Sequence, residues 1–307
     1  MDDAELEELP RGIALAWGVA ASPQRGPKRE MSVERIVDAA VELADAEGLA
    51  AVSMAAVAAR LGYTPMSLYR YISAKDDLVL LMQEAAIGTP PPIEGESWRA
   101  RVVAFHDALM AAYLSHAWVI ELPITGVTAT PNSAAWMDAG IAAFDGTALG
   151  DDARLSLMLL LTGYAHWSAG VTAGMTRRAV ASGRGVDEVN HAEDDLLARL
   201  VTPDEYPSLH RAIAAGELSS GGDPFRFGLD RILDGITTHL DRIERGEVVA
   251  ASLPEPASVD PAVAADKRVK TATKGVREAE KALRAAQKAE RQARREAQER
   301  IERAKSA

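Results

Sequence analysis

The sequence predicts an all-α protein, in which a small N-terminal three-helix domain is followed by a larger helical body. Three observations support this fold class. Apolar residues recur at the three- and four-residue spacing of helices over several segments, and Ser, Thr, Gly and Pro stand where helix ends require them. No segment shows a clear strand-like alternation. With 307 residues, of which 48% are hydrophobic and 26% charged, the chain is long enough for two folded units.

Residues 1–30 are interpreted as an N-terminal extension. Its first part is acidic and contains a short apolar patch, residues 13–17, which is expected to form a short helix that packs on the body. A basic segment, residues 24–29, follows and is expected to be extended. The cations of this arm are Arg25, Lys28 and Arg29.

The next unit, residues 31–88, contains the predicted three-helix domain. Ser32 is a good N-cap for a first helix, and Gly48 is a natural stop. Ser53 is expected to cap a second helix that ends at Gly62.

A short third helix is then predicted, because Thr64-Pro65 pairs an N-cap with proline at the first helical position. It is expected to run to about Tyr71. Residues 73–76, Ser-Ala-Lys-Asp, are interpreted as a capping box that opens a fourth helix.

Residues 89–247 are assigned to the body. A proline run at 89–92 marks a linker or corner. Helices are expected from Ser97 through Tyr113, from Asn132 or Ser133 through Phe144, from 151 to 178, and from 224 to 247. Residues 179–223 are polar and contain glycine, so that segment is expected to be partly loose.

The C-terminal part is predicted to be a linker followed by a tail. Residues 248–265 are rich in Pro, Ala and Ser. Residues 266–307 have high helix propensity, and we expect a charged tail that is helical or disordered. An apolar heptad-like spacing is present in the tail, but most of its members are alanine, which predicts at best a weak coiled coil.

Charge is distributed unevenly. The net charge is -11, but residues 266–307 hold fourteen Lys or Arg against seven Asp or Glu, which is +7. Residues 25–82 are close to neutral at -1, and residues 83–265 carry -13. Because local charge decides contact with nucleic acid, the acidic total does not exclude a DNA-binding protein.

The second and third helices have the lengths and the turn of a helix-turn-helix, with the turn at residues 61–64. In such a motif, the exposed N-terminal residues of the second helix enter the major groove of DNA. Here Leu68 suits the inner face. The candidates for the outer face are Thr64, Pro65, Met66, Ser67 and Arg70.

The segment from Arg35 to Met82 resembles the DNA-binding domain of the tetracycline-repressor (TetR) family of transcription regulators. The matching pieces are Arg35-Ile36, Ala39-Ala40, Glu47-Gly48, Ser53, Val57-Ala58, Leu61-Gly62, Leu68-Tyr69, Lys75-Asp76 and Leu78. The resemblance implies that Ser53, Tyr69 and Lys75 contact DNA phosphates. It also implies that Tyr71 contacts the DNA backbone and that the five outer-face residues face the bases. The basic arm at residues 24–29 resembles the family's arm that reaches into the minor groove.

One feature departs from the family pattern. Many relatives carry Arg or Lys early in the second helix, where this chain has Ala55 and Ala56. One base contact is therefore expected to be missing, which gives Arg70 or the arm more of the specificity. As alternatives, Tyr69 and Tyr71 are packing aromatics, the arm is a solvated linker, and Lys75 is a surface lysine.

The segment from Pro123 to Gly174 resembles, more loosely, the C-terminal domain of the tetracycline repressor. This resemblance implies a homodimer with a small-molecule effector, acting on a palindromic operator in double-stranded DNA. The 151–178 and 225–246 helices are the most apolar and need partners. The candidate interface residues are Leu159, Gly163, Gly170, Leu229, Ile232, Leu233, Ile236 and Leu240.

An apolar, aromatic-rich set of residues predicts a pocket for a small hydrophobic or aromatic effector. The candidate lining is Phe105, His106, Trp118, Trp136, Met137, Tyr164 and Trp167. The alternative is that these residues are ordinary core, and that His106 and His166 are satisfied core or interface histidines. The tetracycline repressor holds magnesium with a histidine and an acid, and that pair cannot be placed here, because the long helix has Gly174 and Met175 where an acid would be needed. No metal and no cofactor is therefore expected.

The uncharged stretch 155–176 leaves a membrane alternative open. It is long enough to span a bilayer, although its histidine, glycines and hydroxyl residues favour burial in protein. With no cysteine and no signal-like N-terminus, we expect a cytoplasmic protein without membrane contact.

The effector is expected to release the protein from DNA, as for a repressor. The opposite sign, in which the ligand promotes DNA binding or the protein activates transcription, is an alternative. No catalytic motif is present, so we predict no enzyme, and an apolar-pocket enzyme is the lesser alternative. A last alternative is an interaction scaffold that uses the basic tail.

Overall fold

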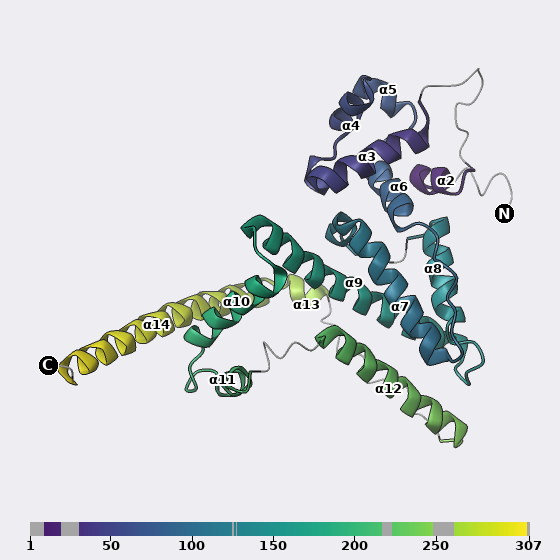
Figure 1. Cartoon of the computed structure of the whole chain (residues 1–307). Helices are drawn as coiled ribbons and strands as arrows, with labels where there is room; N and C mark the ends of the chain where they lie inside the picture. Colours follow the sequence, from purple (N-terminus) through teal and green to yellow (C-terminus); the bar gives the residue numbers. More distant parts are fainter. Residues whose placement is uncertain are drawn as a thin grey trace. The chain divides into compact units, whose positions relative to one another are not determined.

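The computed structural model describes residues 9–19, 31–124, 126, 128–216, 223–247 and 261–305. Over these residues it contains helices and no strand, so the all-α prediction is confirmed (Figure 1). The chain divides into two compact units, Met1–Val249 and Ala250–Ala307. The three predicted Lys and Arg residues of the arm, 25, 28 and 29, lie outside the described residues.

The N-terminal part of the first unit is a small bundle. Its elements are α2 (Arg11–Ala16), α3 (Val33–Glu47), η1 (Leu49–Ala51), α4 (Met54–Leu61), α5 (Pro65–Tyr69) and α6 (Lys75–Ile87). As predicted, Ser32 and Ser53 are N-caps, and each hydroxyl oxygen accepts a hydrogen bond from the backbone N–H three residues later. The side chains of Ile36, Leu68 and Leu78 are fully buried at the centre.

The short N-terminal helix that the sequence predicts is α2, and it packs against α6. The N–H of Gly12 donates to Oδ1 of Asp77 at 3.1 Å, and a Cβ at position 12 would lie 2.8 Å from that oxygen. The indole of Trp17 donates to the carbonyl of Ala129 at 2.9 Å. The extension is therefore attached both to α6 and to the body.

The body is built around one long helix. Its elements are α7 (Trp98–Ser115), η2 (Ala117–Glu121), α8 (Pro131–Ala142), α9 (Asp151–Ser182), α10 (Val186–Leu200), α11 (Pro207–Ala214) and α12 (Pro224–Glu244). Helices α7, α8 and α10 all pack on α9 (Figure 1). Packing is close where α7, α8 and α9 meet, since a Cβ at Gly140 would lie 2.5 Å from Met158 and 2.7 Å from Phe105.

The prediction that residues 179–223 are partly loose is wrong for most of the segment. Helix α9 continues to Ser182 and ends at Gly183, which has a left-handed φ of 67°. Helix α10 follows, with Asp187 and Glu188 in its first turn, and α11 begins at Pro207. Residues 217–222 lie outside the described residues.

Three helix ends differ from the sequence prediction. Helix α6 has Ala74 as its N-cap, because the hydroxyl of Ser73 donates to the side chain of Asp77 instead of forming a capping box. Helix α8 begins at Pro131 rather than at residues 132–133. Helix α5 ends at Tyr69, two residues before the predicted end.

The apolar stripe of α12 is covered within one chain. Leu229 and Leu233 are fully buried, and Ile236 and Leu240 are nearly so. Ion pairs join α12 to α7, from Arg99 to Asp230 and Asp234 and from Arg226 to Asp107. The premise that this stripe needs a second subunit to hide it is therefore wrong.

The second unit contains α13 (Pro261–Ala265) and α14 (Lys267–Lys305). Oδ1 of Asp266 accepts from the N–H groups of Arg268 and Val269, so the start of α14 is capped. The high helix propensity of the tail is thus realised as one long helix. Among the described residues, no helix combines the length and apolarity needed to cross a membrane.

Candidate DNA interface and effector site

Helices α4 and α5 form a helix-turn-helix whose turn is set by one glycine. Gly62 has φ 76° and ψ 27°, the left-handed conformation that allows α4 to end sharply. Thr64 then has extended backbone, and Pro65 opens α5. The hydroxyls of Thr64 and Ser67 lie 3.0 Å apart and share a hydrogen bond across the first turn.

One side of α5 is buried and the other is open. Leu68 and, just after the helix, Ile72 are fully buried, which fixes the orientation of α5 on the bundle. Met66 is 76% exposed and Tyr69 46% exposed, although apolar and aromatic side chains of this size are usually covered. Thr64, Pro65 and Arg70 are also exposed, and Ser67 is half-buried.

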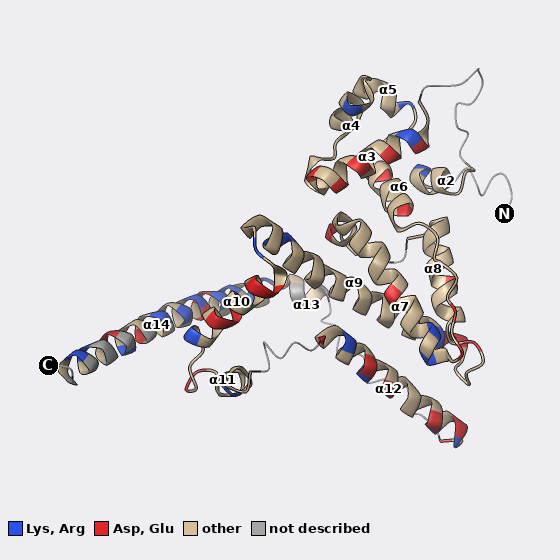
Figure 2. Ribbon diagram, viewed as in Figure 1, with Lys and Arg blue, Asp and Glu red and all other residues tan. Residues whose placement is uncertain are grey.

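The predicted phosphate-binding residues Ser53, Tyr71 and Lys75 lie at or next to the ends of α4, α5 and α6. Ser53 is half-buried and its oxygen already accepts from Ala56, which leaves its hydroxyl hydrogen as a donor. Lys75 is exposed at the first position of α6, and Tyr71 is half-buried between α5 and α6. Figure 2 marks Lys or Arg positions on α4 and just beyond α5, and Asp or Glu positions along α3.

The helix-turn-helix bundle and the body are connected through Asp45 on α3. Oδ1 of Asp45 accepts a hydrogen bond from the indole of Trp118 at 2.8 Å, and Nδ1 of His116 lies 2.8 Å from the same atom. The sequence analysis did not single out Asp45. Its position in the last turn of α3 carries no local signal, because both partners lie far away along the chain.

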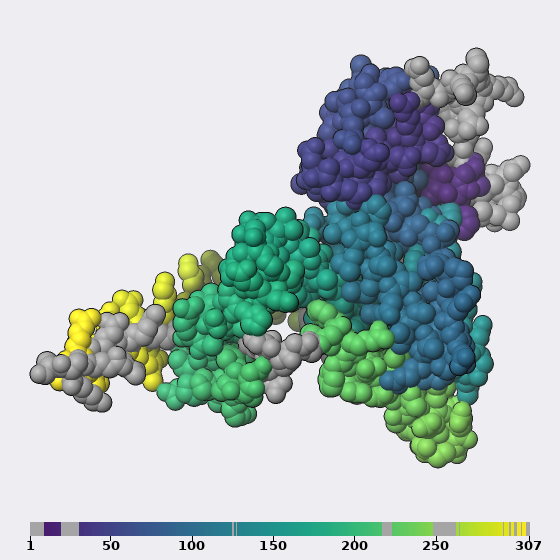
Figure 3. Space-filling view, in the orientation of Figure 1, coloured from purple at the N-terminus to yellow at the C-terminus, as the bar shows by residue number. Residues whose placement is uncertain are grey.

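A second connection joins α6 to α8. The backbone N–H and the side-chain amide of Asn132 donate to Glu84, and the indole of Trp136 donates to the carbonyl of Gly88 at 2.9 Å. Helix α6 runs from the helix-turn-helix to this point (Figure 1). In the space-filling view, the bundle and the body meet over a continuous surface (Figure 3).

Four predicted pocket residues lie within the core of the body. The rings of Phe105 and Trp136 are 6.0 Å apart, and those of His106 and Tyr164 are 5.9 Å apart. His106 is 5% exposed, and its Nε2 is buried without a hydrogen-bond partner among the described residues. Such an atom is costly to leave unpaired, and a bound polar group would satisfy it.

Burial also affects nearby titratable groups. Desolvation raises the pKa of Tyr164, whose hydroxyl donates to the carbonyl of Phe225 at 2.7 Å. It raises the pKa of Tyr113 to about 12 and lowers the pKa of His166, whose ring lies edge-on to Tyr113 at 5.4 Å. This part of the body therefore favours neutral side chains.

The other three predicted lining residues are placed differently. Trp118 is buried at the junction with Asp45, and Trp167 is 55% exposed on α9. Met137 is only partly buried. The structure therefore does not bring all seven residues around one cavity.

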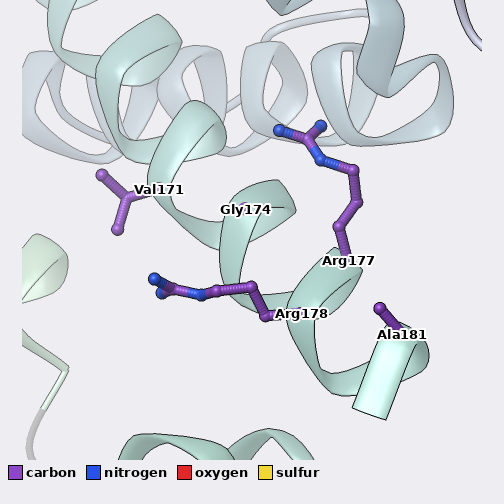
Figure 4. Close-up of a pocket in the computed structure, with 5 residues that line it drawn as sticks. All are labelled: Val171, Gly174, Arg177, Arg178 and Ala181. Atoms are coloured by element: carbon purple, nitrogen blue, oxygen red, sulfur yellow. The ribbon is translucent and has the colours of Figure 1, made fainter. Parts of the chain in front are cut away.

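An open pocket of about 570 Å³ lies elsewhere, on the C-terminal half of α9. Figure 4 shows Val171, Gly174 and Ala181 with the side chains of Arg177 and Arg178 extending in different directions. Arg177 pairs with Glu121 at 3.5 Å and Arg178 with Glu193 at 3.2 Å. Because both cations are paired, this pocket is a weak candidate for an anion.

The outer side of α9 is an exposed apolar surface. Leu155, Leu159 and Trp167 are 38%, 46% and 55% exposed, at spacings of four and eight residues that place them on one face. Gly163 lies between them, and no neighbouring atom comes within 4 Å of its Cβ position. We call these four residues the outer α9 face. Gly170, by contrast, packs on Ile120 of its own chain.

Comparisons with known proteins identify the architecture. Residues 36–82 match the family described as bacterial regulatory proteins of the tetR family, and residues 91–240 match the tetracyclin repressor-like C-terminal domain. The HTH-type transcriptional repressor DrrR1 of Streptomyces coeruleorubidus is 30% identical over 243 residues, which cover 78% of this chain and 89% of DrrR1. An HTH-type transcriptional regulator of Saccharopolyspora erythraea is 39% identical over 114 residues, 36% of this chain and 48% of that protein.

Solved structures show the same fold. ActR of Streptomyces coelicolor in complex with actinorhodin has a TM-score of 0.56 at 23% identity, covering 68% of this chain and 97% of ActR. ActR in complex with (S)-DNPA has a TM-score of 0.54 at 23% identity, covering 69% of this chain and 100% of ActR. The chain belongs to the TetR family of bacterial regulatory proteins, and it is a DNA-binding transcription regulator.

Proposed function

We propose that the protein is a homodimeric repressor that binds a palindromic operator through α5 and is released by a small aromatic effector. The observation that carries the proposal is the open side of α5, where Met66, Tyr69 and Arg70 are exposed while Leu68 fixes the helix from behind. Exposed side chains at the start of such a helix are those that reach base edges in the major groove.

In this proposal Arg70 reads the bases, together with residues 64–67. A guanidinium that pairs twice with guanine contributes about 1–3 kcal/mol of discrimination. Ser53, Tyr69, Tyr71 and Lys75 contact the DNA backbone. Arg25, Lys28 and Arg29 are proposed to reach the adjacent minor groove.

Dimerisation is proposed to use the outer α9 face, with Phe227 of α12, which is 63% exposed. Exposed apolar residues that gather on one face mark an interaction surface. Of the residues that the sequence suggested, Leu159 and Gly163 fit this role. Two copies related by a two-fold axis would place their α5 helices about 34–36 Å apart, one turn of DNA.

The effector is proposed to bind in the body beside Phe105, His106, Trp136 and Tyr164. The unpaired Nε2 of His106 is a polar contact within otherwise apolar surroundings, the combination that small-molecule sites use. ActR, a protein of the same fold, has been solved with actinorhodin and with (S)-DNPA, which supports a small-molecule effector.

In this proposal the signal passes from the effector site to α5 along α6. A ligand that displaces Trp136 acts on the hydrogen bond to Gly88, at the end of α6, and on the contact of Asn132 with Glu84. Helix α6 starts at Lys75, shortly after α5. A shift of α6 therefore moves α5 and changes the separation of the two α5 helices in the dimer. The ligand must bind the two conformations with different affinities for this to work.

The test is selection of bound sequences from a random pool of duplex DNA, followed by titration of the enriched site. We expect a palindromic consensus, with affinity reduced about tenfold or more by Arg70→Ala, in line with removal of a bidentate pairing to a base. The matched control is Arg60→Ala, because Arg60 lies on α4 and pairs with Glu42. No enriched site, or equal reductions in affinity for both variants, would contradict the proposal.

A further inference from the structure

Helix α14 carries a continuous stripe of basic residues. The residues Lys267, Lys270, Lys274, Arg277, Lys281, Arg284 and Lys288 follow one another at alternating spacings of three and four, and all are exposed. The sequence continues the spacing with Arg291 and Arg295. We call residues 267–288 of this series the basic stripe.

The spacing places these cations on one side of the helix. An alternation of three and four averages 3.5 residues, close to the 3.6 of a helical turn, so the stripe drifts only about 20° in seven residues. No acidic residue occupies a stripe position between 267 and 295. The acidic residues Glu278, Glu280 and Glu290 lie outside this series of positions.

The charges of the stripe are available for a partner. Lys274 lies 3.8 Å from Glu278, but both side chains are at least 69% exposed, and such a pair contributes little. The stripe spans roughly 30 Å at about 1.5 Å per residue, close to one turn of duplex DNA. A row of cations of this length matches the regular row of phosphates on a nucleic acid.

We propose that α14 is a second, sequence-independent DNA-binding element, in which the basic stripe contacts backbone phosphates of duplex DNA beside the operator. The choice of DNA over other polyanions rests on the proposed function. A tether to a DNA-bound helix-turn-helix raises the concentration of DNA around the stripe, so that even weak phosphate contacts add to the affinity.

The opposite side of α14 argues against a membrane surface as the partner. Large apolar residues are few there, namely Val269, Val276, Leu283 and Ile301, and most other positions are alanine. Residues 267–305 contain no Phe, Tyr or Trp. Helices that lie on membranes bury a bulky apolar face, often with aromatic residues.

The experiment compares two charge-matched variants of the full chain. The stripe variant is K270Q/K274Q/K281Q/K288Q. The control variant is R268Q/R294Q/R300Q/R303Q, which removes the same number of charges from positions off the stripe. Glutamine has high helix propensity, and circular dichroism checks that both variants keep their helix content.

Binding is measured by fluorescence anisotropy on a labelled 40-base-pair duplex of scrambled sequence, from 50 to 250 mM NaCl. Each phosphate that the protein no longer neutralises makes the slope of log K against log salt shallower by about 0.9, so the stripe variant is expected to have a slope shallower by about 3 to 4 per bound tail. Its Kd at 100 mM NaCl is expected to rise about tenfold or more, while the control stays within about twofold of the parent.

Other outcomes would overturn the inference. Equal weakening in both variants would mean that only net charge matters, and unchanged affinity in both would mean that the tail does not touch DNA. Unchanged DNA binding, with weaker binding to vesicles of phosphatidylcholine and phosphatidylserine, would assign the stripe to a membrane. Unchanged DNA binding with a lower melting temperature of the body would assign it to the acidic residues of its own chain.

The design separates this inference from the proposed function. The scrambled duplex contains no operator, so the stripe variant can bind it like the parent while Arg70→Ala still weakens binding to a selected site. Conversely, the stripe variant can bind scrambled DNA more weakly than the parent even if the selection experiment enriches no operator.

Discussion

The indole Nε1 of Trp118 donates a 2.8 Å hydrogen bond to Oδ1 of Asp45, and this bond joins η2 of the body to α3 of the helix-turn-helix bundle. Trp118 is 3% exposed, while the carboxylate of Asp45 is about one-third exposed and also lies 2.8 Å from His116. The junction is therefore a specific polar contact at the edge of an apolar core.

Replacing Trp118 by Phe is expected to lower the free energy of unfolding by about 1 kcal/mol beyond the change in packing, the usual contribution of one such hydrogen bond. Urea unfolding of Trp118→Phe, Asp45→Ala and the double variant measures the coupling. Trp17→Phe is a useful control, because its indole bond to Ala129 is exposed. Strictly additive destabilisation by the Trp118 and Asp45 changes would show that the bond does not stabilise the junction.

The two sides of α5 should respond differently to truncation. Leu68→Ala removes a fully buried side chain and is expected to cost about 2–5 kcal/mol of stability. Met66→Ala changes a side chain that is 76% exposed, and it is expected to alter stability by less than about 0.5 kcal/mol. Thermal unfolding followed by circular dichroism gives both values, and similar destabilisation by the two changes would mean that the outer side of α5 is not open.

A charge on the outer α9 face should disrupt the proposed dimer. Leu159→Glu buries a carboxylate in the interface and is expected to shift sedimentation from dimer to monomer at micromolar protein. Leu200→Glu on α10 is the matched control, because Leu200 is also exposed, at 62%, and lies outside this face. If Leu159→Glu stays dimeric, the interface lies on another surface.

His166 is expected to make the stability of the folded protein depend on pH. Burial lowers its pKa in the folded protein below the ordinary value of 6.5, so folding favours the neutral ring. The resulting stability is fully present above pH 6.5 and is lost as the pH falls through 6.5 toward the lower folded pKa. His166→Gln should therefore lose less stability than the parent between pH 7.5 and 5.5, as measured by urea midpoints; a parallel decline in both proteins would exclude His166 as the source.

Much of the helix-turn-helix could be predicted from local sequence. The caps at Ser32 and Ser53 and the stop at Gly62 depend on contacts within three or four residues, so the residue types reveal them directly. The same reasoning failed at Ser73, since its hydroxyl bonds to the side chain of Asp77, which itself accepts the N–H of Gly12 from a distant helix.

The body was less predictable, because an apolar stripe on a helix does not show which other surface will cover it. The apolar spacing of α12 suggests a dimer surface, but Leu229 and Leu233 are fully buried within one chain, in which α12 is joined to α7 through Arg99 and to α9 through Tyr164. Exposed apolar residues lie on α9, including Trp167, which the sequence places among the pocket residues, and on α12 itself Phe227 is exposed.

The sequence by itself determined that the chain is helical, where most helices lie, and which residues stand on each side of α5, because these properties depend on neighbours within one or two turns. Tertiary structure decided which stripes are hidden, and it brought Trp118 to Asp45 across 73 positions of the chain. Such pairings depend on the packing of whole helices against one another, and no local pattern encodes them.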